Sequence, residues 1–242
     1  MSLGNLCFFA VLASVMALPA TRGSELRPSD TRTRNSSTLE TPPAVVLLPS
    51  RNPSDLGLGR LLVASRELSD PIFGQTVILL VHYDTDGVIG LMLNRRTDLP
   101  ISRVFAQLKT AKNLSDPVYL GGPVETPTVF ALFHSPQTPE VAQRVFGGVY
   151  WISAKSALEK LVSSHPAPAV FHVYLGYAGW TPEQLRNEVR LGGWFIFPAD
   201  HDTVFHADPD SLWRQMIRKT EIEMKMAGDP KRGPALKSPA AY

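Results

Sequence analysis

The most concentrated set of side chains that could bind a metal ion lies close to the C-terminal end of the sequence. Asp200, His201 and Asp202 are consecutive, and His206 and Asp208 follow within a few residues. Imidazole and carboxylate ligands suit a divalent transition metal. The spacing, however, lacks the pair of histidines four residues apart that metal-binding helices present, and Asp208 is expected to cap a helix. The sequence therefore favours a polar loop here, and we expect no metal and no cofactor.

A second group could bind an anion at the end of a predicted strand. Asn94, Arg95 and Arg96 directly follow an apolar segment that begins at Val88. The planar guanidinium of arginine matches the geometry of a phosphate or a carboxylate. The simpler alternative is that Asn94 closes the strand while the two arginines pair with nearby acids. The residues alone leave both interpretations open.

Two other groups lack the partners that their chemistry would need. The backbone at Gly121 and Gly122 could approach a phosphate, but no Lys-Ser or Lys-Thr follows as in a P-loop, so a tight turn fixed by Pro123 is favoured. His134 and Ser135 are adjacent on a predicted strand, where neighbouring side chains point to opposite faces. The sequence also contains no Gly-x-Ser-x-Gly motif. It therefore disfavours a serine hydrolase.

Aromatic residues interleaved with glycines could form a binding surface. Tyr177, Gly179 and Trp180 precede a predicted helix, and such a segment can hold an apolar ligand or a partner chain. Alternatively, the glycines let the chain turn into the helix while the aromatic rings fill the end of the domain. His172, in the strand before this segment, is interpreted as a half-buried structural histidine.

Apolar runs bounded by turn residues predict the strands that would position these groups. Residues 77–83 and 88–94 are joined by Asp84-Thr85-Asp86-Gly87, which suits a tight reversal, so the two segments predict a β-hairpin. Their nearly continuous apolar character indicates burial on both faces. Similar runs predict strands at residues 60–64, 129–133, 149–152, 170–175 and 194–197.

Two short helices are predicted between these strands. From Ile101 to Leu108 the apolar residues follow the spacing i, i+3, i+4 and i+7, which predicts a helix that should pack on the hairpin. A second helix is expected at residues 153–162, with Ser153 as its N-cap.

Two further helices have clear start signals. Thr181 can cap a helix, Pro182 suits its first position, and Gln184 would complete a capping box. Gly192 and Gly193 would end that helix. The last helix begins after Asp208 and buries one apolar stripe, formed by Leu212, Trp213, Met216 and Ile217. Strands interspersed with few helices predict an α+β domain.

Six short motifs, taken together and in this order, closely resemble the AlgH-like family of bacterial proteins over roughly residues 58–213. They are Leu62-Val63-Ala64-Ser65, Leu68-Ser69-Asp70-Pro71-Ile72-Phe73, Gly90-Leu91-Met92-Leu93-Asn94-Arg95, Tyr119-Leu120-Gly121-Gly122-Pro123-Val124, Leu132-Phe133-His134-Ser135 and Leu175-Gly176-Tyr177-Ala178-Gly179-Trp180. The resemblance implies a single α+β domain in which a mostly antiparallel, bifurcated sheet curls into a pseudo-barrel with peripheral helices. It implies no catalytic residues.

The segments outside this domain suggest export. Residues 1–23 resemble a signal peptide whose apolar run is too short for a stable membrane span, although the usual positive charge ahead of it is missing. Residues 24–57 predict a disordered linker, residues 58–226 the domain, and residues 227–242 a disordered tail. We therefore expect an exported protein, periplasmic or secreted; the alternative is the cytoplasm, which is usual for the family that the chain resembles.

The amino-acid composition excludes some classes of function for this chain and disfavours others. The lone Cys7 excludes disulfides and thiol catalysis in the domain, and 24 basic against 22 acidic residues disfavour nucleic acid as a partner. We expect a non-catalytic binding or regulatory module for a protein or small ligand; the alternative is a metal-assisted hydrolase or phosphate-ester enzyme. The expected contact surface consists of Asn94, Arg95, Gly121, Gly122, Tyr177, Gly179 and Trp180.

Overall fold

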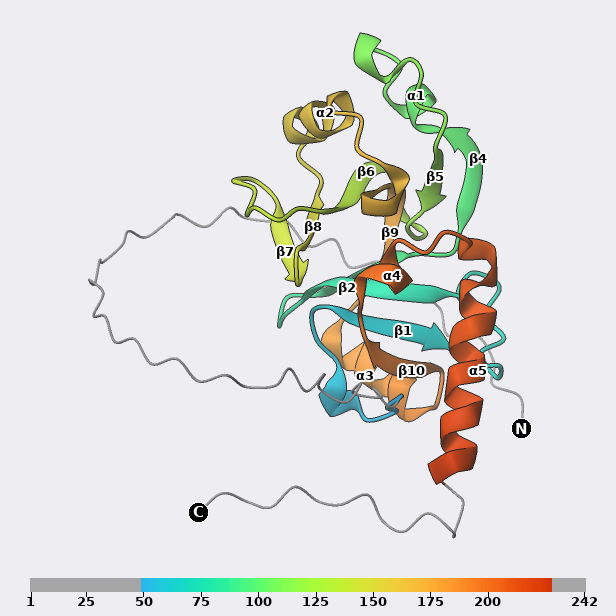
Figure 1. The fold of residues 1–242 in the computed structure, drawn as a ribbon. Helices are drawn as coiled ribbons and strands as arrows, with labels where there is room; N and C mark the ends of the chain where they lie inside the picture. The colour runs from blue at the N-terminus through green and yellow to red at the C-terminus, as the bar shows by residue number, and fades with distance from the viewer. Residues whose placement is uncertain (1–48, 228–242) are drawn as a thin grey trace, which may run out of the picture.

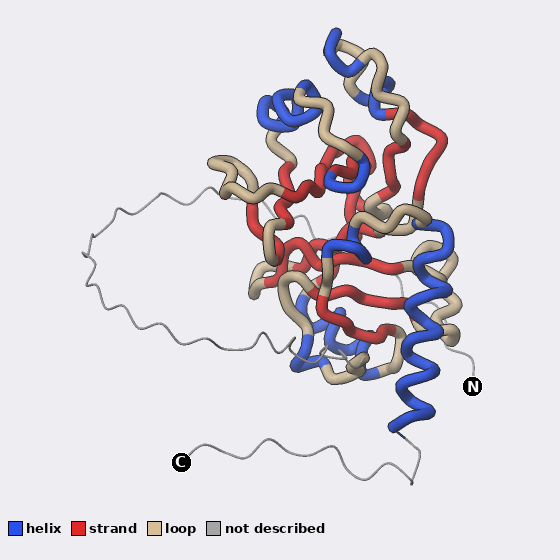
Figure 2. The backbone as a smooth tube through the Cα atoms, viewed as in Figure 1, coloured by secondary structure: helices blue, strands red, loops and turns tan. Residues whose placement is uncertain are grey.

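The computed structural model describes residues 49–227 of the chain. The expected leader at residues 1–23, the expected linker up to residue 48 and the tail from residue 228 lie outside the described residues. Figure 1 and Figure 2 show the strands gathered in the middle of the molecule, with the helices at its periphery.

Four strands form the first branch of the sheet. Their order is β10 (Trp194–Pro198), β1 (Arg60–Ala64), β2 (Val77–Tyr83) and β3 (Val88–Met92), and all neighbours are antiparallel. Most residues of these strands are buried, as their continuous apolar character predicts. The predicted hairpin of β2 and β3 is confirmed.

The second branch continues from β3 across the molecule. The next strands are β9 (Phe171–Trp180), β6 (Val124–His134), β8 (Val149–Ile152) and β7 (Gln143–Phe146), again antiparallel. The strand predicted at residues 149–152 is confirmed, and those predicted in β6 and β9 are confirmed but longer than expected. In particular, β9 runs on to Trp180, five residues beyond the end predicted at residue 175.

The sheet forks along β9. The first half of β9 pairs in parallel with β5 (Pro117–Leu120), which pairs with β4 (Arg96–Pro100), whereas the end of β9 pairs with β3. Gly176, with a φ of 66°, lies between the two regions. In the fork, the N–H of Gly121 donates to the Leu175 carbonyl at 2.8 Å. The predicted α+β fold, with a bifurcated and curled antiparallel sheet, is confirmed.

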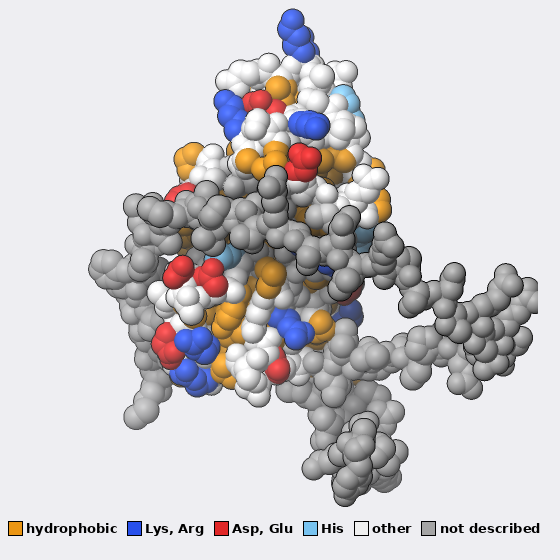
Figure 3. Space-filling view, turned by 90° about the vertical axis from the view of Figure 1, so that its left-hand side faces the viewer, with side chains coloured by type: hydrophobic (Ala, Val, Ile, Leu, Met, Phe, Trp, Pro, Cys, Tyr) orange, Lys and Arg blue, Asp and Glu red, His pale blue; other side chains and the backbone are white. Residues whose placement is uncertain are grey.

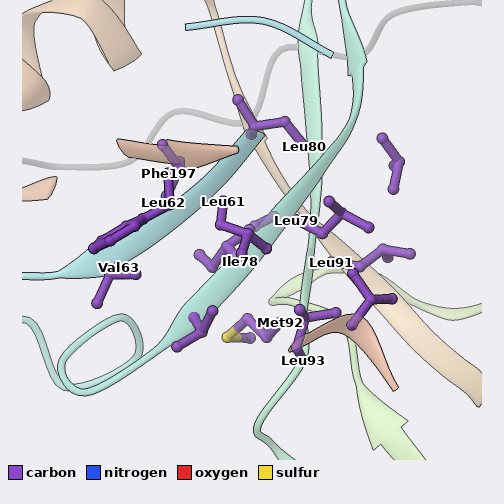
Figure 4. Close-up of a cluster of buried hydrophobic side chains, with 14 of the residues drawn as sticks. Leu61, Leu62, Val63, Ile78, Leu79, Leu80, Leu91, Met92, Leu93 and Phe197 are labelled. Atoms are coloured by element: carbon purple, nitrogen blue, oxygen red, sulfur yellow. The ribbon is translucent and has the colours of Figure 1, made fainter. Parts of the chain in front are cut away.

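One large hydrophobic core lies against the first branch and continues to side chains of β6, β7, β8 and β9. Figure 4 shows leucine and other apolar side chains of β1, β2 and β3 packed together with Phe197 of β10. Leu61, Leu79 and Leu91 are fully buried there. Burying a leucine contributes about 1.5–3 kcal/mol, so this cluster supplies much of the stability of the fold.

A second hydrophobic cluster lies against the other branch, under α1 (Ile101–Val104) and α2 (Lys155–Ser163). The helix predicted from Ile101 to Leu108 is only one turn long and packs in this cluster, so its predicted contact with the hairpin is wrong. A 3-10 turn, Lys109–Ala111, follows it. The N-cap of α2 is Ala154 rather than the predicted Ser153.

Of the remaining helices, α3 and α5 pack on the first branch, and α4 lies near β6 and β9. In α3 (Pro182–Arg190), Thr181 accepts the Gln184 N–H at 3.1 Å, which confirms the predicted cap. The side chain of Gln184, however, donates to Glu188 rather than back to the cap, so a reciprocal capping box does not form. Next come the short α4 (His201–Val204) and the long α5 (Pro209–Ala227), which packs on β1.

Residues 50–56, which fall in the expected linker, contact the domain. Ser50 forms an antiparallel bridge with Ile196 in β10, with hydrogen bonds of 2.9 and 2.7 Å. A 3-10 turn, Pro53–Asp55, follows and lies next to α3. A third 3-10 turn, Pro168–Val170, leads into β9. The bridge thus covers part of the outer edge of β10.

Candidate functional site

A surface depression of about 130 Å³ lies between the start of α5 and the loop that precedes β2. Two of the seven predicted contact residues, Asn94 and Arg95, line it. The other lining residues come from distant parts of the sequence and were not predicted. They are Gln75, Asp210, Trp213 and Arg214.

Asn94 fixes the shape of this depression. Its side chain is only 7% exposed, and both ends of its amide are used. The oxygen accepts the N–H of Val77 at 2.9 Å, while the nitrogen donates to the carbonyl of Gln75 at 2.9 Å. Gln75 is exposed and has a φ of 58°, a conformation that costs a non-glycine residue free energy. The buried amide therefore holds a strained residue at the rim.

The loop from Asp70 to Thr76 is fixed by hydrogen bonds within itself. The Asp70 carboxylate accepts the N–H groups of Ile72 and Phe73, each at 2.8 Å, and the Thr76 hydroxyl donates to the Phe73 carbonyl at 2.6 Å. The ring of Phe73 contacts both Trp180 and Trp194, with centroids 5.7 and 6.1 Å away. The loop is thereby anchored in the core, and the part of it that forms the edge of the depression is held in place.

Positive charge exceeds negative charge around the depression. Arg95 donates to the carbonyl of Gly74 at 2.6 Å, and Arg214 is exposed on α5. Neither guanidinium forms an ion pair with another of the described side chains. The carboxylate of Asp210, in contrast, is occupied by Arg96 at 2.7 Å. Two guanidiniums beside the depression thus have no acidic partner among the side chains that the structure describes.

The predicted contact residues Gly121, Gly122 and Tyr177 meet in the fork of the sheet, next to β3, which ends two residues before Asn94. A Cβ atom on Gly121 would lie 2.2 Å from the carbonyl oxygen of Gly176, and one on Gly122 would lie 2.1 Å from the carbonyl carbon of Tyr177. Glycine is required at both positions because the two backbones touch. The structure thus assigns these glycines a packing role; whether a ligand also contacts them stays a prediction.

Trp180 and Gly179, the other predicted contact residues, lie at the end of β9. Trp180 is only 5% exposed, and its indole N–H donates to the Glu188 carboxylate at 3.2 Å. The indole N–H of Trp194 donates to the same carboxylate oxygen at 2.8 Å. Burial raises the pKa of Glu188, while these donors and Gln184 act in the opposite direction. The carboxylate therefore ties two strands to α3.

The residues considered for metal binding are engaged in local contacts. Asp200 caps α4 by accepting the N–H and the hydroxyl of Thr203, at 2.9 and 2.7 Å. His201 contacts its neighbour Asp202 at 3.2 Å, and His206 bonds to the backbone of Asp208. Within residues 49–227, no three histidine, cysteine or acidic side chains converge as a metal site would require.

The adjacent His134 and Ser135 do not interact as nucleophile and base. The Ser135 hydroxyl donates to the Gln137 carbonyl at 2.7 Å, while the ring of His134 meets that of His201 edge-on, with centroids 5.1 Å apart. His134 is the last residue of β6 and Ser135 lies beyond its end, so the argument from alternation along a strand does not apply to this pair.

A larger groove of about 220 Å³ lies between α1, β6 and α2. Its floor is apolar, with Phe105, Val129 and Leu158, and its rim carries the opposite charges of Lys155 and Glu159. No predicted contact residue lines it. On the face of the molecule drawn in Figure 3, acidic, basic and hydrophobic side chains are interspersed. Among the described residues, no helix has the length and apolar character needed to span a membrane.

Comparison with solved structures identifies the same fold elsewhere. The solution structure of AlgH from Pseudomonas aeruginosa matches with a TM-score of 0.57 and 27% identity, over 73% of this chain and 95% of that one. A crystal structure of a protein from Corynebacterium diphtheriae matches with a TM-score of 0.58 and 21% identity, over 68% of this chain and 87% of that one.

Sequence comparison gives the same relationship. A UPF0301 protein from Ruegeria pomeroyi is 35% identical over 171 residues, which are 68% of this chain and 92% of the relative. Another from Cupriavidus metallidurans is 32% identical over 176 residues, 70% of this chain and 92% of the relative. A family model described as AlgH-like matches residues 61–225. The chain therefore belongs to the AlgH-like family.

Proposed function

We propose that the domain is a non-catalytic binding module that holds an anionic group, a carboxylate or a phosphate, in the depression beside α5. The observation that carries the proposal is the buried amide of Asn94, which holds the exposed Gln75 in a left-handed backbone conformation at the rim. Strained backbone of this kind is concentrated at functional sites.

The side chains around the depression determine the class of ligand. Arg95 and Arg214 supply guanidinium donors, and Gln75 supplies a side-chain amide. Guanidinium groups bind carboxylates and phosphates with two parallel hydrogen bonds, which gives both affinity and orientation. The one acid in the lining, Asp210, is already neutralised by Arg96. An anion therefore meets uncompensated positive charge rather than repulsion.

Binding of simple anions to the full-length protein tests this proposal. We expect sulfate, phosphate and acetate to shift the backbone amide signals of Gln75 and of the first turn of α5 in NMR titrations. Arg214→Ala should weaken this binding by roughly 10- to 100-fold, because it removes a charge-assisted hydrogen bond worth roughly 1.5–3 kcal/mol. An acidic peptide that binds far more tightly than these ions would identify the anion as part of a protein partner.

Arg218→Ala is the matched control. Arg218 is exposed one turn further along α5 but does not line the depression, so its loss should leave anion affinity nearly unchanged. If both variants weaken binding equally, the ions respond to the general field of the helix and the proposed site is wrong. Absence of any shift at Gln75 would also contradict the proposal.

A further inference from the structure

His172 is the most deeply buried histidine among the described residues, at 8% exposure. Its ring stacks on that of Tyr119, with centroids 4.6 Å apart, and its Nδ1 lies 3.4 Å from the hydroxyl of Tyr174. The ring of Phe205, which directly follows α4, packs against its edge at 5.3 Å. His172 thus joins β5, β9 and the α4 segment in one contact.

The surroundings favour the neutral ring of His172. Burial lowers its pKa to about 4, from an ordinary value of 6.5. No described acid faces it to stabilise a positive charge. The titratable groups packed around it are Tyr119 from β5, Tyr174 from β9, and, through Phe205, His201 from α4 and His134 from β6.

The first connection between His172 and the depression runs through β4. Tyr119, which stacks on His172, is the cross-strand neighbour of Arg96. Arg96 pairs with Asp210 at 2.7 Å, and Asp210 lines the depression. A movement of the Tyr119 ring therefore reaches the ion pair that fixes the first turn of α5.

The second connection runs along the chain itself. Phe205 packs on His172 and lies only four residues before Pro209, the first residue of α5. Between them, Nδ1 of His206 lies 2.9 Å from the carbonyl oxygen and 3.1 Å from the backbone nitrogen of Asp208, close enough to hydrogen-bond with one of them, which keeps this connection compact. Displacement of Phe205 would thus pull directly on the start of α5, where Asp210 and Arg214 line the anion site.

We propose that protonation of His172 displaces Phe205 and α4 from the sheet, shifts the start of α5, and thereby weakens anion binding in the depression. This regulation rests on the proposed binding function. The opening itself does not depend on a ligand, so it can be tested separately.

The size of the effect follows from proton linkage. In the opened state His172 is solvated and recovers its ordinary pKa of 6.5, whereas in the closed state its pKa is about 4. Acid therefore favours the opened state, and its population should rise about 20-fold between pH 7 and pH 5. Below pH 4 both states are protonated and the rise should stop.

Hydrogen exchange of the full-length protein tests the opening. Protection factors of amides in residues 201–214, corrected for intrinsic exchange, should fall about 20-fold from pH 7 to pH 5. In His172→Phe, which keeps an aromatic ring without a titrating nitrogen, the fall should vanish. His134→Ala, which removes an exposed histidine from the same chain of ring contacts, should behave like the parent protein. His172→Gln serves as a second variant if His172→Phe does not fold.

An equal fall in the parent protein and in both His172 variants would overturn the proposal. Sulfate affinity gives the functional readout, because sulfate remains a dianion throughout this pH range. The affinity should fall with pH in the parent protein and stay nearly constant in His172→Phe. If sulfate does not bind even at pH 7, the proposed function fails while the exchange result still decides on the opening. If sulfate binds with the same pH dependence in both proteins, only the regulation is wrong.

Discussion

The side-chain amide of Asn94 donates a hydrogen bond to the main-chain carbonyl of Gln75 and thereby holds that residue at a φ of 58°. The two residues are 19 positions apart in the sequence and lie side by side at the open end of the β2–β3 hairpin. The end of one strand thus determines how the chain enters the other, and the anion site proposed above is built on that junction.

Asn94→Ala should destabilise the protein by about 2–3 kcal/mol, because it leaves the N–H of Val77 and the carbonyl of Gln75 without partners. Urea unfolding measures this loss. Gln75→Gly is the informative companion, since glycine adopts the left-handed conformation without strain and should leave stability unchanged or raised by up to about 1 kcal/mol. A loss of stability in Gln75→Gly would show that its backbone is not strained.

Gly121→Ala should destabilise the fold by at least about 3 kcal/mol, because the added methyl group would lie 2.2 Å from the Gly176 carbonyl oxygen and backbone cannot yield as a side chain can. Gly57→Ala is the control, since nothing lies within 4 Å of its Cβ position. Thermal unfolding compares the two variants. Similar stability in both would mean that the fork is looser than described.

Glu188→Leu should cost about 3 kcal/mol or more, because the indole N–H groups of Trp180 and Trp194 would lose their acceptor inside the protein. Glu188→Gln retains one carbonyl oxygen and should lose less. Urea unfolding, followed by the fluorescence of the tryptophans, measures both variants. Equal effects of the two substitutions would argue that the hydrogen bonds contribute little.

The folded protein should become less stable in acid because of His172. The unfolded chain binds a proton near the ordinary pKa of 6.5, but the folded protein does so only near pH 4, so the contribution of His172 is complete above about pH 6.5 and is lost as the pH falls toward 4. Each unit between the two pKa values is worth about 1.4 kcal/mol, which gives a total of about 3 kcal/mol. The free energy of unfolding, measured with urea from pH 7 to pH 4, should depend less steeply on pH in His172→Phe than in the parent protein. The same pH dependence in both proteins would contradict this assignment.

Export of the chain also remains a prediction, because the leader-like residues 1–23 lie outside the described structure. We expect the mature protein to begin at Ser24. Sequencing the N-terminus of the protein purified from its native cells checks this, and a chain that still carries its leader would leave the two other possibilities, an uncleaved anchor or the cytoplasmic alternative.

The sequence predicted the buried strands well, because a continuous apolar run such as β2 has few alternatives to burial on both faces. It did not predict β4, because none of the residues of that strand is buried and they include Asp98 and Pro100. It also missed the end of β9, where glycines indicated a turn. Those glycines serve the close approach of two backbones, which no local pattern reveals.

Only part of the candidate site was predicted, for a similar reason. Asn94 and Arg95 were recognised by their position after a strand. The side chains of Asp210 and Arg214 come from α5, more than 110 residues further along the chain, and the strained backbone of Gln75 has no signature in the sequence. A site assembled from such distant segments becomes visible only when the fold is known.

The pairing of β1 with β10 constrains how the domain can be made. During synthesis, β1 leaves the ribosome more than 100 residues before the strand that completes its hydrogen bonds, and Trp213, which donates to the carbonyl of Ala64, appears later still. Contacts so distant in sequence form slowly. The nascent chain must therefore carry an apolar, half-paired strand until translation is nearly finished, and chaperones that shield such a strand should raise the yield of native protein.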